Sequence, residues 1–197
     1  FSVDLDRQNL KFPEVDTPKA IAYDFDEKID LVFNETIDIL KNQFIKARYT
    51  PFHYLKKLPT EFELTRQENL GAFMKTMIIK RLESSFYAFK NTINRFVKSH
   101  EEYLKMINSG TIFVSKKLNI FDLLDEDDDE KINRIVDENL AQKFKTEDFN
   151  SNFKKDVQND LDCLITIKNL WKDIDTDPKL KKLISTLKKD NNLKENK

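Results

Sequence analysis

Glycine is almost missing from this chain of 197 residues, which contains only Gly71 and Gly110. A Walker A phosphate-binding loop needs two glycines separated by four residues, so the chain has no such loop. A single cysteine, Cys163, excludes an internal disulfide and a zinc site built from cysteines. It lies among leucines, where we interpret it as a small buried hydrophobic residue rather than a reactive thiol. The low cysteine content favours a reducing compartment, and we expect a cytoplasmic protein.

Other absences exclude further classes of protein. No apolar run reaches the roughly 20 residues that cross a bilayer, so we expect no membrane contact. The net charge of -1 provides no general basic field for nucleic acid, and any such contact must be local. The two histidines, His53 and His100, have no third metal ligand near them in sequence. The acidic run 125–130 lacks the glycine and the alternating ligands of a calcium loop. We therefore expect no metal and no cofactor bound to this chain.

Charged and hydrophobic residues dominate the composition, at 35% and 39%, with only five prolines. This balance is typical of helix-rich globular proteins, and we predict a mainly α fold. The expected architecture is an irregular multi-helix bundle with one long central helix and one or two short β-strands. Because the chain starts at Phe1 without a methionine, we expect a piece of a longer protein.

Three regions are expected: an extended segment with a short strand at 1–25, a helical connecting domain at 26–187, and a flexible tail at 188–197. Alternating polarity over 19–25, with apolar residues at 21, 23 and 25, predicts the short strand, and helical spacing follows it from Asp26 to about Ala47. The prolines between Arg48 and Thr65 predict an ordered loop, with room for a short helix.

The central prediction is one continuous helix, because an apolar stripe runs from Leu70 to Ile107 before Asn108 and Gly110 stop it. A short strand or extended connector is expected at 111–114. Helical patterns then predict three more helices: one led by the acidic run and reaching Leu140, one capped by Asp148 or Asn150 and reaching Trp171, and one from Asp177-Pro178 through Leu187.

One part of the central stripe is unusual because it places a basic pair, a carboxylate and two hydroxyls within an amphipathic helix. Two interpretations are open. The group is a solvated helix face with weak local ion pairs, or it docks against a neighbouring domain. The residues are Lys80, Arg81, Glu83, Ser84 and Ser85.

A second group combines basic and aromatic side chains, the pattern of a nucleic-acid contact. Here too two interpretations are open, a contact with the DNA backbone or a structural loop, and salt dependence of binding would separate them. The lysine-rich stretch 179–189 is the second candidate for a nucleic-acid contact. Trp171 either stacks on a base or seals the edge of the core. The candidate contact residues are Lys46, Arg48, Tyr49, Lys56 and Lys57.

The order of several motifs resembles the segment that joins the two motor lobes of Swi/Snf-type, superfamily-two helicase-related ATPases, in a bacterial subgroup. The most specific part is Lys-Arg-Leu-Glu-Ser-Ser within 79–89, which resembles an "lKRLESSxxAF" helix. The other matching stretches are Lys11-Phe12-Pro13-Glu14-Val15, Ala22-Tyr23-Asp24-Phe25, Arg48-Tyr49-Thr50-Pro51 with Tyr54-Leu55, and Asp177-Pro178-Lys179-Leu180 through Lys188.

This resemblance implies an accessory domain that links and positions two motor lobes of the same chain, with double-stranded DNA as a further candidate partner. ATP and magnesium are implied for the parent protein, not for this chain. The chain lacks the acidic metal-binding box and the arginine motif of the motor, so we expect no enzyme activity from it alone. The competing interpretation is a stand-alone helical scaffold or adaptor whose stripe from Leu70 to Ile107 binds a partner helix.

Overall fold

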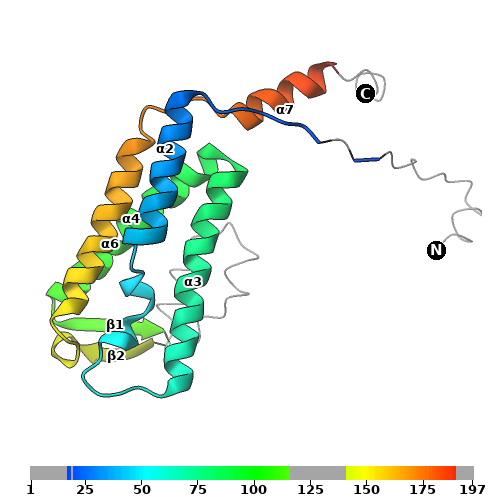
Figure 1. Ribbon diagram of the computed structural model, residues 1–197. Coiled ribbons are helices and arrows are strands. Elements are labelled where there is room, and N and C mark those ends of the chain that lie inside the picture. Colours follow the sequence, from blue (N-terminus) through cyan, green and yellow to red (C-terminus); the bar gives the residue numbers. More distant parts are fainter. Residues whose placement is uncertain (1–16, 19, 116–140, 190–197) are drawn as a thin grey trace, which may run out of the picture.

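The computed structural model describes residues 17, 18, 20–115 and 141–189 (Figure 1). Four predicted features lie outside these residues: the proline-containing exit at 11–15, the acidic run 125–130, the helix expected up to Leu140, and most of the C-terminal tail. Everything said below about structure refers to the described ranges.

The predicted mainly α fold is confirmed. Helices form most of the described chain, and one two-stranded antiparallel sheet closes an end of the body (Figure 1). The helices are α2 (Glu27–Asp38), α3 (Glu61–Ser84), α4 (Phe86–Asn108), α6 (Asn152–Leu170) and α7 (Pro178–Lys189), and the strands are β1 (Thr111–Ser115) and β2 (Ala141–Lys145).

The first helix begins as the sequence predicts but ends earlier. The Asp26 carboxylate accepts a hydrogen bond of 2.8 Å from the backbone N–H of Ile29 and so caps α2. The helix then passes into a π-helical turn, η1 (Ile39–Gln43), and does not continue to Ala47. The following segment is the expected ordered loop, with the short 3-10 turns η2 (Ala47–Tyr49) and η3 (Pro51–Tyr54).

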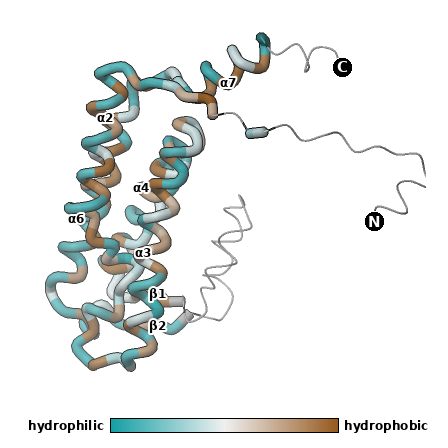
Figure 2. The backbone as a smooth tube through the Cα atoms, turned by 45° about the vertical axis from the view of Figure 1, so that its right-hand side comes forward, coloured by the Kyte–Doolittle hydropathy of each residue, from teal (hydrophilic) through white to brown (hydrophobic). Residues whose placement is uncertain are grey.

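The prediction of a single long central helix is wrong. The stripe belongs to two helices, α3 and α4, which meet at Ser85 and lie side by side as an antiparallel pair (Figures 1 and 2). Ser85 has an extended backbone, with φ -160° and ψ 130°, and its hydroxyl accepts a bond from the N–H of Ala88. Serine is favoured at helix caps because its hydroxyl can bond nearby backbone groups. The apolar spacing hides this break because it resumes on the far side of the turn.

Of the predicted strands, one is confirmed and one is wrong. Strand β1 forms where extended residues were expected, and it pairs with β2, which the sequence did not predict, with Ile112 opposite Phe144. No strand forms at 21–25, because no other extended segment in the described residues lies alongside it. This N-terminal segment instead packs through the ring of Phe25 against Phe33 and Phe86.

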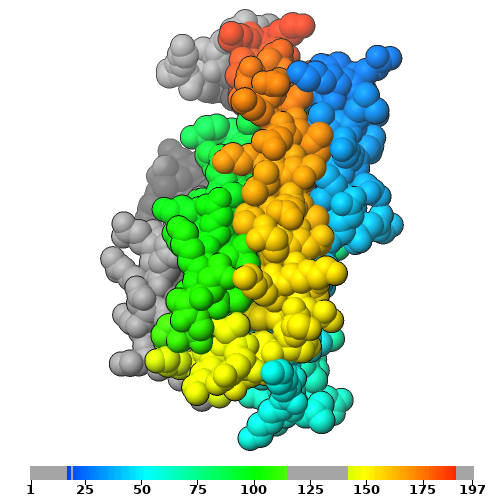
Figure 3. Space-filling model, turned by 90° about the vertical axis from the view of Figure 1, so that its left-hand side faces the viewer, coloured from blue at the N-terminus to red at the C-terminus, as the bar shows by residue number. Residues whose placement is uncertain are grey.

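The core runs along the body between α4 and α6; α3 packs against α4 (Figure 1), and α2 lies beside α6 (Figure 3). Hydrophobic residues recur along all four helices at helical spacing (Figure 2). The apolar stripe of α3 and α4 is therefore used inside the protein. Its buried members include Met74, Ile78, Leu82, Phe86, Phe89, Ile93 and Phe96.

Candidate functional site at the base of the helical body

The unusual polar group of the sequence lies at the end of α3, where the chain turns into α4. The N-terminal segment and the start of α7 reach the same place (Figure 1). Together they surround a small cavity of about 170 Å³. We call this end of the molecule, which is at the top of Figure 1, the base. Its lining residues are Tyr23, Phe25, Phe33, Leu82, Glu83, Ser84, Ser85, Phe86, Asp177 and Lys179.

Asp177 connects the start of α7, which we call the outgoing chain, to the turn between α3 and α4. One carboxylate oxygen accepts a bond of 3.0 Å from the backbone N–H of Phe86, and the other accepts one of 3.2 Å from the N–H of Leu180. The same side chain therefore caps α7, as the sequence predicted, and holds the N-terminal turn of α4. A carboxylate is favourable at both places because helix N-termini carry partial positive charge.

Further contacts strengthen this junction. The ammonium group of Lys179 donates to the carbonyl oxygen of Glu83 at 3.2 Å. On the incoming side, the ring of Phe25 lies 6.0 Å from that of Phe86. Phe86 in turn packs edge-on against Trp171, at 4.7 Å between ring centroids. Incoming chain, outgoing chain and helical turn are thus in contact through a continuous set of side chains.

The five residues predicted for docking divide by exposure. Lys80, Glu83 and Ser84 are exposed, while Arg81 and Ser85 are half-buried. The carbonyl of Arg81 accepts the N–H of Ser85 at 3.0 Å and closes the last turn of α3. A neighbouring domain could therefore reach the exposed three directly.

Helix α7 presents an apolar face that the sequence pattern alone did not reveal. None of its residues is buried, and four aliphatic side chains at positions i, i+3, i+4 and i+7 are between 42% and 53% exposed. This spacing forms one stripe on a helix. Lysines occupy much of the remaining surface. The four aliphatic residues are Leu180, Leu183, Ile184 and Leu187.

The predicted DNA-contact group is split between interior and surface. The Arg48 guanidinium bonds the Ser99 hydroxyl and lies 5.6 Å from the ring centroid of Tyr49 and 5.4 Å from that of Tyr103. Burial raises the pKa of Tyr49 to about 12. Arg48 and Tyr49 thus serve the packing of the loop.

The three lysines of that group lie at or near the surface. Lys56 and Lys57 are exposed in the loop before α3. Lys46 is half-buried and has a left-handed backbone, with φ 71°. Its side chain packs beside Gly71, where an added Cβ would lie 3.4 Å from the Lys46 Cδ. Of the five, only Lys56 and Lys57 are fully available to a nucleic-acid backbone.

Asp160, which the sequence did not single out, anchors this loop from α6. Its buried carboxylate accepts bonds of 2.6 Å from the N–H groups of both Ile45 and Ala47, on either side of the strained Lys46. Burial raises the pKa of Asp160 to about 6, although the backbone donors oppose that rise. Asp160 is one of three aspartates in α6, with Asp156 and Asp162, and nothing in the sequence marks it out for this role.

His100 is buried beneath the same loop. Its Nδ1 is 2.8 Å from the carbonyl oxygen of Phe96, which makes Nδ1 the donor. Its Nε2 is buried and has no hydrogen-bond partner among the described residues. Burial, together with the nearby Arg48 charge, lowers the pKa of His100 to about 3. The ring therefore stays neutral and acts as part of the core.

The other residues that the sequence analysis considered for a functional role also belong to the core. Trp171 is 1% exposed and its indole N–H donates to the Thr36 hydroxyl at 2.8 Å, so it lies in the core rather than on a stacking surface. Cys163 is buried, and burial raises the pKa of its thiol to about 11. Within the described ranges no three potential ligands gather as a metal site.

No helix in the described parts of the chain has the length and apolar character needed to cross a bilayer. Comparison with protein-family models, with curated proteins and with solved structures gives no match to this chain.

Proposed function

We propose that this chain is the helical domain that joins and positions the two motor lobes of a Swi/Snf-like, ATP-dependent DNA translocase. One observation carries the proposal: the incoming segment and the outgoing helix meet at a single base, beside the stretch 80–85 that most resembles such proteins. A body held at one end by both of its connections is suited to lie between two domains of one chain.

The exposed features of the base fit this role. The aliphatic stripe of α7 and the partly exposed Ile21 and Tyr23 leave apolar surface uncovered where flanking domains would attach. ATP and magnesium would bind in those lobes, and the parent would work in the cytoplasm. We also propose that Lys56 and Lys57 contact the DNA backbone. Both are exposed in the loop before α3, at the opposite end of that helix from the base.

The competing function, a scaffold that binds a partner helix along the stripe from Leu70 to Ile107, needs that stripe at the surface. The stripe is largely buried against the other helices of the chain. The junction at the base, in contrast, has direct side-chain contacts that favour the connecting role.

The test is made in the full-length parent, whose flanking sequences must carry a phosphate-binding loop on one side and an arginine motif on the other. We expect Asp177→Ala, and separately the pair Arg81→Ala and Glu83→Ala, to lower DNA-stimulated ATP hydrolysis severalfold while leaving unstimulated hydrolysis intact. Asp175→Ala is the control, since Asp175 is exposed two residues earlier. Unchanged stimulation in both variants, or flanks without motor motifs, would refute the proposal.

A further inference from the structure

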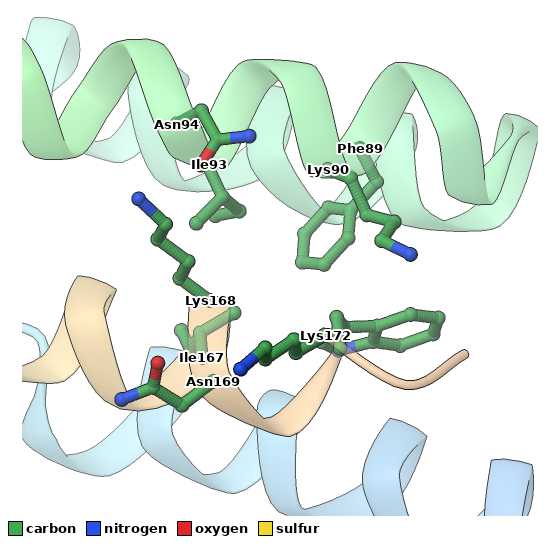
Figure 4. Close-up of a pocket in the computed structure, with 9 residues that line it drawn as sticks. Phe89, Lys90, Ile93, Asn94, Ile167, Lys168, Asn169 and Lys172 are labelled. Carbon is green, nitrogen blue, oxygen red and sulfur yellow. The ribbon is translucent and has the colours of Figure 1, made fainter. Parts of the chain in front are cut away.

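A larger pocket, of about 420 Å³, lies between α4 and α6, where these two helices run side by side at the surface (Figures 3 and 4). This volume falls within the range of small-molecule sites, about 300 to 1,000 Å³. Four of its residues come from α4 and the rest from the C-terminal end of α6 and just beyond. They are Phe89, Lys90, Ile93, Asn94, Ile167, Lys168, Asn169, Trp171 and Lys172.

The floor of the pocket is apolar and rigid. Phe89 and Ile167 are fully buried, and Ile93 and Trp171 are each 1% exposed. The Trp171 ring is fixed by its edge-on contact with Phe89, at 5.2 Å, and by its hydrogen bond to Thr36. These contacts hold the walls of the pocket in place before any ligand binds, so the site is preorganised.

The rim is basic and amide-rich. Lys168 extends from α6 toward α4, Lys172 lies in the turn just after α6, and Lys90 comes from α4 (Figure 4). The Lys90 ammonium group is held by a bond of 2.8 Å to the carbonyl oxygen of Ile174. Asn94 and Asn169 add amide donors, and among the residues that the structure describes no acidic side chain lines the pocket.

Three like charges around one pocket repel one another. A bound anion would remove this repulsion. Three ammonium groups with two amides suit the several oxygens of a phosphate better than the two of a carboxylate. The floor, in turn, suits a small organic group attached to that phosphate.

We propose that this pocket binds a small organic phosphate, such as a mononucleotide, with the phosphate among Lys90, Lys168 and Lys172 and the organic part on the apolar floor. The site is concave and bounded by two helices, which fits a small molecule better than the convex backbone of a duplex. Its lining shares no residue with the cavity at the base, and the proposal does not depend on the function proposed above.

The experiment uses adenosine monophosphate and inorganic phosphate as probes. Because Trp171 is the only tryptophan, its indole N–H gives one reporter signal in a ¹H–¹⁵N spectrum. We expect adenosine monophosphate to shift this signal with a Kd below about 1 mM, and inorganic phosphate to bind more weakly at the same site. The double variant Lys168→Gln, Lys172→Gln should weaken binding by about tenfold.

The matched control is Lys154→Gln with Lys155→Gln, which removes the same charge from exposed positions at the other end of α6. It should leave the affinity within about twofold. No shift at about 10 mM of either probe, or equal weakening in both double variants, would overturn the proposal. Binding of duplex DNA that requires Lys168 and Lys172, without mononucleotide binding, would also overturn it and would assign the site to a nucleic-acid backbone.

Discussion

Replacing Asp160 with alanine should detach the loop at 44–60 from α6. The carboxylate is fully buried and accepts the backbone N–H groups of Ile45 and Ala47, both at 2.6 Å. Alanine offers no acceptor, and water has little access to a site that the surrounding core covers. Both donors would therefore lose their partners in the folded state.

The expected magnitude follows from two opposing effects. Each orphaned donor costs about 1 to 3 kcal/mol, so the pair costs about 2 to 6 kcal/mol. Removing the buried charge returns part of this, because burial disfavours the ionised carboxylate and raises its pKa to about 6. We expect a net loss of about 2 kcal/mol at pH 7 for Asp160→Ala, and a smaller loss for Asp160→Asn, which retains one acceptor oxygen.

Urea denaturation, followed by the fluorescence of the single tryptophan, measures this loss. With a slope of about 2 kcal/mol per molar urea, the midpoint should fall by about 1 M. The control is Asp162→Ala, on the same helix, where the exposed carboxylate bonds only the Gln158 side chain; its midpoint should change by less than about 0.3 M. An unchanged or increased stability of Asp160→Ala would refute the anchoring role.

Two further predictions concern buried polar side chains. His100 has a folded-state pKa of about 3, below its ordinary value near 6.5, so the unfolded chain binds more protons between these values and stability falls as pH falls through this window. Relative to His100→Gln, the protein should lose about 2.5 kcal/mol between pH 6.5 and 4.5, measured by denaturation at each pH, and parallel pH profiles would contradict this. Thr36→Val removes the acceptor of the buried Trp171 indole N–H and should cost about 1 to 3 kcal/mol in thermal or urea unfolding. The Thr36 hydroxyl also donates to the carbonyl oxygen of Val32, four residues earlier, and the exposed Thr76 hydroxyl donates in the same way to that of Ala72. Thr76→Val should therefore cost less than about 0.5 kcal/mol, and equal losses in the two variants would argue against a special role for Thr36.

The sequence was a good guide to which residues are helical and buried, because both follow from local spacing. Asp26 and Asp177 mark helix starts through side-chain caps that act within three residues. The break at Ser85 was missed because apolar spacing measures which face of a helix is buried, not whether two helices are continuous. Strand β2 was missed because pairing with β1 depends on residues about 30 positions apart.

The candidate sites were harder to predict than the fold. The meeting of the stretch 80–85 with both chain connections depends on tertiary folding, and only the capping role of Asp177 was visible locally. Arg48 resembled a phosphate ligand because it is basic, whereas in the structure it packs against Tyr49 and Tyr103. The sequence does not distinguish these uses, since both need a guanidinium near aromatic rings.

In the connecting role proposed above, attachment to flanking domains at the base alone would make the helical body a lever fixed at one end. Helix α4 runs from the base to the β-sheet at the opposite end (Figure 1), and its 23 residues span about 35 Å. A rotation of about 10° at the base would therefore carry the sheet through about 6 Å, with no change in the core. A pair of spectroscopic labels, one at exposed Lys143 on β2 and one on a flanking domain, would report such a rotation as an amplified displacement.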